Sequence, residues 1–319
     1  MKITRFFPLI GIALFAYLLL NIDLGKTFRI LSEVNITLIF FAVLVSVLVV
    51  FLKAFKWKLI VDLYGKKYSV REATKAWVMG FSLSVVTPGR LGDLSRAYYI
   101  KDRAGLGKGL TTVIIDRVID IAILFCLAIL GFLSFVAFFT QYSNLFFTVS
   151  ALFALFVLGV LISTKKEIVR ALLKPVFRRL VPEKHKSALH LTFHEFYSGL
   201  ASIRKGKVRV LLAVMVGLLV WAISIFQYFL LATALGLNVP LLFLVSVVPL
   251  VALLDILPVS FSGIGTRDAA LILFFSFISV GKEYAISLSL LALLFGYVLI
   301  GLAGAFFMLK GEHKAIRRD

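Results

Sequence analysis

Six stretches of this chain are apolar over about the length that a helix needs to cross a membrane, and the first of them is short. Such a helix requires about 20 mostly apolar residues, because the hydrocarbon layer offers no water to bond with free backbone groups. The chain is 61% hydrophobic and only 16% charged, whereas a soluble domain carries about 25% charged residues. We therefore expect an all-α polytopic membrane protein with about six full transmembrane helices, at residues 6–22, 36–55, 111–139, 145–163, 210–235 and 284–309.

Two further apolar regions are interrupted by helix-breaking residues, at 87–96 and 258–268. Pro88 and Pro258 each remove a backbone donor, and glycines follow both prolines. Non-helical backbone at membrane depth is tolerated where it is buried in protein or lines a watery cavity. The pattern predicts two re-entrant broken hairpins, at 76–100 and 241–280.

Positive charge gathers in one set of loops. The chain has 35 Lys and Arg against 16 Asp and Glu, and the segments 56–75, 101–110, 164–209 and the C-terminal tail are strongly basic. By the positive-inside rule, these segments and both termini lie on the cytoplasmic side of the plasma membrane. The loops at 140–144, 236–240 and 281–283 then lie outside. The two hairpins would open from opposite sides, so the two halves would form an inverted-topology repeat.

The whole chain, 1–319, is expected to form a single integral membrane domain. It divides into a first half at 1–163, a basic segment at 164–209 and a second half at 210–319. Within the basic segment apolar residues recur at helical spacing, which predicts an amphipathic helix on the anionic leaflet. Trp57 follows two lysines and is predicted to anchor its helix at the membrane interface.

Several other classes of site are not expected from the sequence. Cys126 is the one cysteine, so the chain can form no internal disulfide. His190 and His194 are four residues apart, but they lie in the basic segment and are expected on a solvated helix face rather than at a metal. The glycine-rich pieces match neither a P-loop nor a dinucleotide fingerprint. We expect no metal, no cofactor and no nucleic acid partner.

The two breaks hold the best candidates for substrate binding. Arginine binds phosphate through forked donors, so Arg90, Arg96 and Arg267 are predicted to hold an anionic group. Glycines let the chain turn and free backbone N–H groups that favour an anion. The predicted binding glycines are Gly89, Gly92, Gly263 and Gly265.

Charged side chains near the breaks have two alternative roles, structural charge pairing or proton coupling. Asp93 and Arg96 are three residues apart and face one another on a helix. Asp116 and Asp120 share a helical face, so both carboxylates can pair with Arg90 or Arg96. Asp255 has no charged neighbour in the sequence, and Arg267 is its natural partner. The full set is Asp93, Asp116, Arg117, Asp120, Asp255 and Asp268.

The ordered motifs at 52–58, 87–96, 116–120 and 258–268 resemble the flippase-like family that includes the transmembrane region of lysylphosphatidylglycerol synthases. The resemblance covers most of the chain, although the family more often has Glu where this chain has Asp93, Asp116 and Asp268. It implies translocation of a lipid with an anionic or modified head group. In the synthases a soluble aminoacyl-transfer domain follows the membrane region. This sequence reaches Asp319 without one, so lipid aminoacylation by this chain alone is not expected.

Three functions follow from these features as hypotheses. The first is a flippase or transporter that moves an anionic or modified phospholipid, or a polyprenyl-phosphate-linked lipid, between leaflets. The second is a membrane enzyme or accessory subunit in lipid or lipid-linked glycan synthesis. The third is a scaffold for a separate lipid-modifying synthase or glycosyltransferase. Membrane lipids with anionic head groups are the expected partners in the first case.

Overall fold

The computed structural model describes residues 7–64, 68–134, 143–180 and 183–311, and within these ranges it is helical without any strand. The end of the span expected at 111–139, the start of the loop at 140–144 and the C-terminal tail lie outside the described residues. The longer helices are α1 Phe7–Leu20, α2 Leu24–Ser32, α3 Ile36–Val61, α4 Val70–Val85, α7 Leu106–Ser134, α9 Ser143–Ser163, α10 Lys166–Leu180, α11 Glu183–Lys205, α12 Lys207–Ala234, α13 Leu241–Leu254, α14 Thr266–Ser276, α15 Lys282–Leu293 and α16 Leu299–Leu309. Short helical segments join them: η2 Asp62–Tyr64, η3 Pro88–Ser95, α5 Arg96–Tyr99, α6 Lys101–Ala104 and the π-helical η5 Leu294–Val298.

Four of the described helical segments are long and apolar enough to cross a membrane: Ile36–Tyr64, Phe146–Ser163, Lys207–Ala234 and Lys282–Leu309. α1 reaches that length only together with α2, and the pair is bent by 91°. The helices thus support an integral membrane protein with four such segments, or up to five if the bent pair is one span. The predicted count of six full spans is not confirmed.

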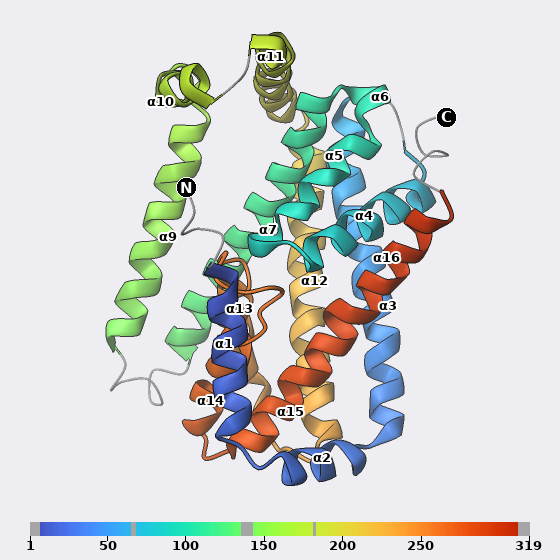
Figure 1. Cartoon of the computed structure of the whole chain (residues 1–319), viewed down its shortest axis with the longest axis vertical. Coiled ribbons are helices and arrows are strands. Elements are labelled where there is room, and N and C mark those ends of the chain that lie inside the picture. Colours follow the sequence, from blue (N-terminus) through green and yellow to red (C-terminus); the bar gives the residue numbers. More distant parts are fainter. Residues whose placement is uncertain (1–6, 65–67, 135–142, 181–182, 312–319) are drawn as a thin grey trace.

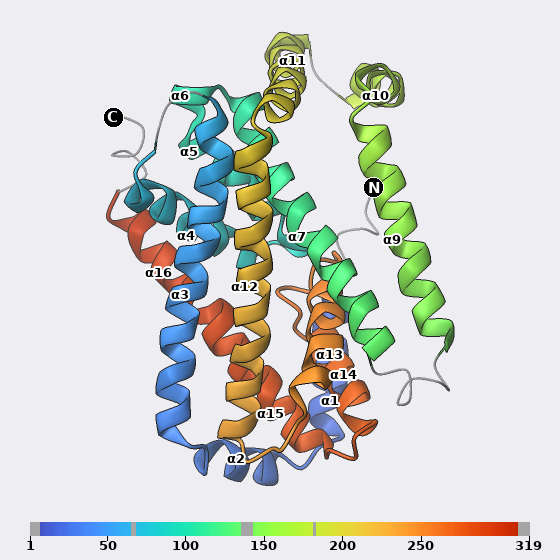
Figure 2. The same cartoon turned by 180° about the vertical axis from the view of Figure 1, so that it is seen from behind.

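The long helices form a bundle with short helices across its ends. α3, α7, α9 and α12 run roughly along the long axis, whereas α2 lies across one end and α10 across the other (Figure 1, Figure 2). α3 and α12 are packed along each other, and Nε2 of Gln227 on α12 donates to Oγ of Ser46 on α3 at 2.5 Å. This bond satisfies two buried polar groups inside an otherwise apolar helix pair.

The first break follows α4. A capping box between Ser69 and Glu72 starts this helix, and Pro88 begins the short helical turn η3 after its end. Gly89 and Arg90 have φ values of 59° and 56°, the left-handed region that reverses the chain. α5 and α6 then lead toward the end of the bundle where α11 lies (Figure 1).

The second break connects α13 with α14, which lie side by side at the opposite end (Figure 1, Figure 2). Its loop has positive φ at Ser262, Gly263 and Gly265. Oγ of Ser262 donates to the carbonyl oxygen of Val85 at 2.8 Å, at the end of α4. The two breaks, which are far apart in sequence, therefore contact each other inside the protein.

The basic segment forms α10 and α11 at one end of the bundle (Figure 1). α11 packs over the start of α7, where Oε2 of Glu195 accepts the backbone N–H of Gly107 at 2.8 Å. The hydroxyl of Tyr197 donates to the carbonyl oxygen of Ser163 at 3.0 Å, and burial raises the pKa of this phenol. Leu172 of α10 is 64% exposed, so this helix keeps an apolar side chain free of the bundle.

Candidate functional site

Two groups of charged side chains are buried near the first and second breaks. The first, the paired cluster, comprises Lys56, Asp93, Arg96, Asp116, Arg117 and Asp120. The second, the cavity cluster, comprises Lys53, Arg90, Asp255, Arg267 and Tyr297. Ionised groups are expensive at membrane depth unless they are paired or functional. The partners of each group therefore decide which role it has.

Arg96 and Lys56 form the centre of the paired cluster. Arg96 is fully buried, with Nη1 2.9 Å from Oδ2 of Asp116 and Nε 3.8 Å from Oδ1 of Asp93. Nζ of Lys56 lies 3.0 Å from Oδ1 of Asp116 and 2.5 Å from Oδ1 of Asp120. Because Asp116 and Asp120 are one helical turn apart on α7, both carboxylates face the same ammonium group.

Arg117 completes the paired cluster through an ion pair with Asp93. The cluster then contains three cations and three carboxylates, so its charges balance within the protein. Removing one member of a buried pair leaves an uncompensated charge, which is strongly destabilising. The geometry thus supports the structural alternative for these residues: they fix α3, the first break and α7 to one another.

Trp57 lies beside this cluster, and its predicted position at the membrane interface is wrong. The side chain is only 1% exposed, and Nε1 donates to Oγ1 of Thr112 at 3.1 Å. The guanidinium of Arg96 lies 5.3 Å from the ring centroid, which is within range of a cation–π interaction. α3 continues to Val61, past the expected end at residue 55, and this carries Trp57 and Lys56 into the protein interior.

Asp255 is the centre of the cavity cluster. Its Oδ2 accepts a hydrogen bond from the hydroxyl of Tyr297 at 2.5 Å and lies 3.5 Å from Nη2 of Arg90. Nη1 of Arg267 lies 3.9 Å away. Both guanidinium groups also lie over the Tyr297 ring, at 5.0 Å for Arg90 and 5.1 Å for Arg267. One carboxylate and one phenol ring thus hold two arginines from opposite breaks.

Arg90 and Arg267 differ in their burial and in the hydrogen bonds that they make inside the protein. Arg267 is fully buried, donates from Nε to Oγ of Ser289 at 2.9 Å and from Nη1 to the carbonyl oxygen of Ser262 at 3.1 Å. Its role in the geometry is to tie α14 to α15. Arg90 is partly exposed and lines a cavity. It is therefore the arginine of this cluster that a ligand can reach.

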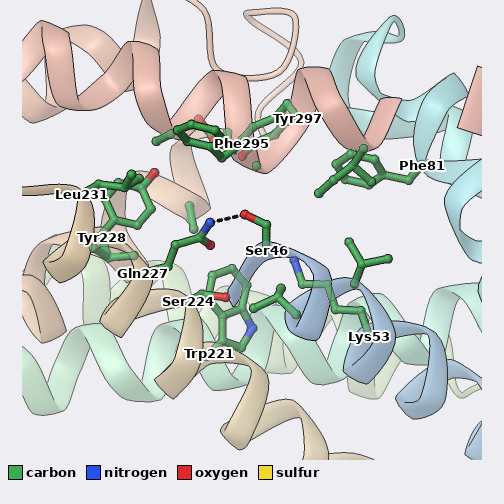
Figure 3. Close-up of a pocket in the computed structure, with 18 of the residues that line it drawn as sticks. Ser46, Lys53, Phe81, Trp221, Ser224, Gln227, Tyr228, Leu231, Phe295 and Tyr297 are labelled. Atoms are coloured by element: carbon green, nitrogen blue, oxygen red, sulfur yellow. Dashed lines mark hydrogen bonds between the residues drawn. The ribbon is translucent and has the colours of Figure 1, made fainter. Parts of the chain in front are cut away.

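The cavity has a volume of about 80 Å³ and lies between α3, α12, α13 and η5. Figure 3 shows the side chains of Ser46, Lys53, Gln227, Tyr228 and Tyr297 around it. This volume is below the roughly 300–1,000 Å³ of a typical small-molecule pocket. The cavity is large enough for several waters, and a lipid head group would require the surrounding helices to separate.

Lys53 lines this cavity and makes no ion pair with any residue that the structure describes. Its ammonium lies 5.5 Å from the Trp221 ring centroid and 6.0 Å from the Trp77 ring centroid. Two aromatic faces attract a cation but do not neutralise it. Lys53 consequently presents to the cavity a positive charge that no ion pair with a described residue neutralises.

The cavity cluster as a whole has an excess of positive charge. Lys53, Arg90 and Arg267 supply three cations against the single carboxylate of Asp255. The next acid along the loop, Asp268, is buried and accepts the backbone N–H of Gly265 at 2.7 Å, which stabilises the start of α14. Even with Asp268 counted, positive charge remains in excess. An anion is the ligand that this environment favours.

The structure brings some of the predicted site residues into contact and keeps others apart. Arg267 with Asp255, and Arg96 with Asp93, are both brought together. Arg96 does not line the cavity beside Arg90, because it is enclosed by the paired cluster. The role of each residue in substrate binding remains a prediction.

Three participants were missed by sequence reasoning: Lys53, Lys56 and Tyr297. Both lysines stand at the end of an apolar run, where lysines usually flank a membrane-spanning helix. Asp116 and Asp120 offered a signal for Lys56, because two carboxylates on a buried face of α7 need a nearby cation. Tyr297 gave no signal in the sequence, since it is one aromatic residue within the last apolar stretch.

The predicted binding glycines have packing reasons for being glycine. A Cβ at Gly92 would lie 2.2 Å from the carbonyl carbon of Leu83, and a Cβ at Gly263 would lie 2.0 Å from Oδ1 of Asp255. Gly263 also has a φ of 80°. A Cβ at Gly265 would lie 2.0 Å from the carbonyl oxygen of Gly11, and a Cβ at Gly89 would lie 3.2 Å from Cβ of Pro258. Each glycine thus permits a close approach between segments.

Replacing Gly92 by alanine is expected to destabilise the first break. The neighbouring atoms belong to the α4 backbone and cannot rotate away, and overpacking of this kind costs about 1–3 kcal/mol or more. Thermal unfolding in detergent measures the loss. Gly159→Ala on α9 is the matched control, because nothing lies within 4 Å of the added Cβ. Equal melting temperatures for the two variants would contradict the packing argument.

The remaining sequence motifs do not contribute to this site. His190 and His194 are exposed on α11, and no group of three metal-ligating side chains occurs in the described ranges. Cys126 is also exposed, on α7.

Comparison with known proteins agrees with the resemblance in the motifs. The chain is 27% identical to a UPF0104 membrane protein of Methanocaldococcus jannaschii, over 93% of this chain and 90% of the relative. It is 24% identical to a UPF0104 membrane protein of Pyrococcus horikoshii, over 95% and 96% of the two chains. No solved structure matches it. The family described as the lysylphosphatidylglycerol synthase TM region matches residues 8–304, and the chain belongs to that family of integral membrane proteins.

Proposed function

We propose that this protein moves an anionic lipid between the leaflets of a membrane and holds the head group in the cavity beside Arg90 and Lys53. The observation that carries the proposal is the excess of positive charge at this cavity, inside a bundle of apolar helices. Family membership suggests a membrane protein of lipid metabolism or transport. A phosphate is common to phospholipids and polyprenyl-phosphate lipids, and Arg90 offers it a forked donor.

The positions of the two breaks support alternating access. The segments at 76–100 and 241–280 approach the cavity from opposite ends of the bundle and contribute Arg90 and Asp255, respectively (Figure 2). In this proposal they are re-entrant hairpins of an inverted repeat, and each opens in turn while the substrate stays near the midplane. No described feature resembles a nucleotide site, so the movement is passive or ion-coupled.

The basic helices supply the proposed orientation. α10 and α11 lie at one end of the bundle, and α6 lies at the same end (Figure 1). Placing this end at the anionic cytoplasmic leaflet satisfies the positive-inside rule and gives Lys166 and Arg170 lipid phosphates to contact. The protein would then reside in the plasma membrane with both termini inside.

Leaflet exchange in proteoliposomes tests the proposed function. Vesicles with the purified full chain receive fluorescent phosphatidylglycerol or fluorescent phosphatidylcholine, and the accessible label is then reduced chemically from outside. Phosphatidylglycerol is expected to exchange at least tenfold faster than phosphatidylcholine, because the choline cation opposes the positive cavity. Equal rates for both lipids, or rates no higher than in empty vesicles for every anionic lipid tried, would contradict the proposal.

A further inference from the structure

A second cavity adjoins the charged one, between α3 and the η5–α16 segment. It has a volume of about 190 Å³, and Val78 of α4 is among the residues that line it. Both cavities are lined by Ser46, Val50, Phe295 and Ile300. The two cavities are therefore adjacent, and these four shared side chains lie between them.

The lining of the second cavity is effectively hydrocarbon. Ser46 is its one polar residue, and the hydroxyl already donates to the carbonyl oxygen of Ala42 at 3.0 Å and accepts from Gln227 at 2.5 Å. An apolar cavity of about 150 Å³ stays dry and takes up hydrocarbon ligands. Water and inorganic ions are thus poor occupants of this space.

The second cavity opens toward the outer surface of the bundle. Val47 on α3 is 64% exposed and Leu299 on α16 is 43% exposed, and both line it. Their helices belong to two of the segments that are long and apolar enough to cross a membrane. The opening consequently faces the hydrocarbon layer and not an aqueous phase.

The π-helical segment η5 connects the two environments. The backbone N–H of Leu299 bonds to the carbonyl oxygen of Leu294, which is the wider spacing of a π turn, a geometry frequent at functional sites. Tyr297 faces Arg90 and Asp255, whereas Phe295 of the same segment lines the apolar cavity. A single short segment thus contacts both a charged region and a hydrocarbon region.

From this arrangement we propose that the apolar cavity between α3 and α16 receives one acyl or prenyl chain of the same lipid whose head group occupies the charged cavity. The inference rests on the proposed function and adds a binding site for the hydrocarbon chain of its substrate. The substrate is a long-chain anionic amphiphile that enters sideways from the bilayer between α3 and α16, and not a water-soluble anion.

Filling the apolar cavity tests this inference. Ala303 lines it on α16, and Ala303→Phe occupies the space, while the neighbouring Leu302 is 62% exposed and does not line it. We expect Ala303→Phe to slow leaflet exchange of phosphatidylglycerol at least tenfold and to change the affinity for glycerol phosphate less than twofold. Leu302→Phe is the matched control and should leave both unchanged. Unchanged exchange in Ala303→Phe, or an equal loss of glycerol phosphate affinity, would overturn the inference.

Photocrosslinking gives a second readout that does not depend on transport. Phosphatidylglycerol with a diazirine in one acyl chain is incorporated into proteoliposomes of the full chain, and the labelled peptides are identified by mass spectrometry. Label is expected within 43–50 and 295–303, and Ala303→Phe should reduce it. Label confined to other outward-facing helices would overturn the inference. Wild-type protein that labels at these positions but exchanges no lipid would refute the proposed function alone.

Discussion

Replacing Arg96 by methionine should remove a large share of the protein's stability. The guanidinium is fully buried and lies 2.9 Å from Asp116 and 3.8 Å from Asp93. Methionine fills similar volume but leaves the paired cluster with two cations and three carboxylates. Breaking a buried ion pair by removing one partner typically costs about 3–5 kcal/mol. Thermal unfolding in mild detergent, with recovery of monodisperse protein as a second measure, should show this loss.

Two further variants separate charge imbalance from lost packing. The double variant Arg96→Met/Asp116→Asn restores equal numbers of cations and carboxylates, and it should recover part of the stability through coupling between the two sites. Lys26→Ala is the exposed control, because its ammonium is 3.4 Å from Glu283 and its side chain is 53% exposed. Pairs of that kind contribute about 0–1 kcal/mol. An Arg96→Met protein as stable as Lys26→Ala would show that the paired cluster does not hold the helices together.

The sequence predicts the class of fold well, because apolar length is a local property. The span predicted at 145–163 matches the membrane-length segment Phe146–Ser163, and the helix break at Pro88 and Gly89 is present as a left-handed turn. The first predicted span, at 6–22, is not confirmed, because α1 reaches membrane length only together with α2. α1 is a helix of 14 residues that ends at Leu20, and its backbone approaches the second break, with Gly11 N–H donating to Val259 O at 3.2 Å.

The partners of the charged residues could be predicted only in part. Arg96 and Asp93 are neighbours on one turn, so their contact follows from local spacing. Lys56 and Asp120 are 64 residues apart, and their pairing depends on how α3 packs on α7. Without that packing, Lys56 is indistinguishable from the many lysines that flank apolar helices. The same limit applies to Lys53, because the absence of an ion pair between it and the described residues is a property of the assembled cavity.

Neutralising the two cations that line the charged cavity should abolish selective lipid exchange. Lys53 and Arg90 reach the cavity, and hydrogen bonds to charged groups are worth about 1.5–3 kcal/mol each. Lys53→Gln or Arg90→Gln alone should reduce phosphatidylglycerol exchange on the order of tenfold or more. The double variant should exchange phosphatidylglycerol and phosphatidylcholine at similar rates. Of the two single variants, Arg90→Gln should also lose stability, because it leaves Asp255 with fewer partners.

Lys53→Gln is the sharper of these tests, because Lys53 makes no ion pair with any residue in the described ranges. Its removal takes away positive charge without leaving a carboxylate unpaired, so thermal stability should stay near that of the wild type while exchange falls. Lys26→Gln removes the same charge from an exposed site and should change neither quantity. If Lys53→Gln exchanges phosphatidylglycerol as fast as Lys26→Gln, the excess charge of the cavity does not recruit the head group. The anion would then have to bind elsewhere than beside Lys53.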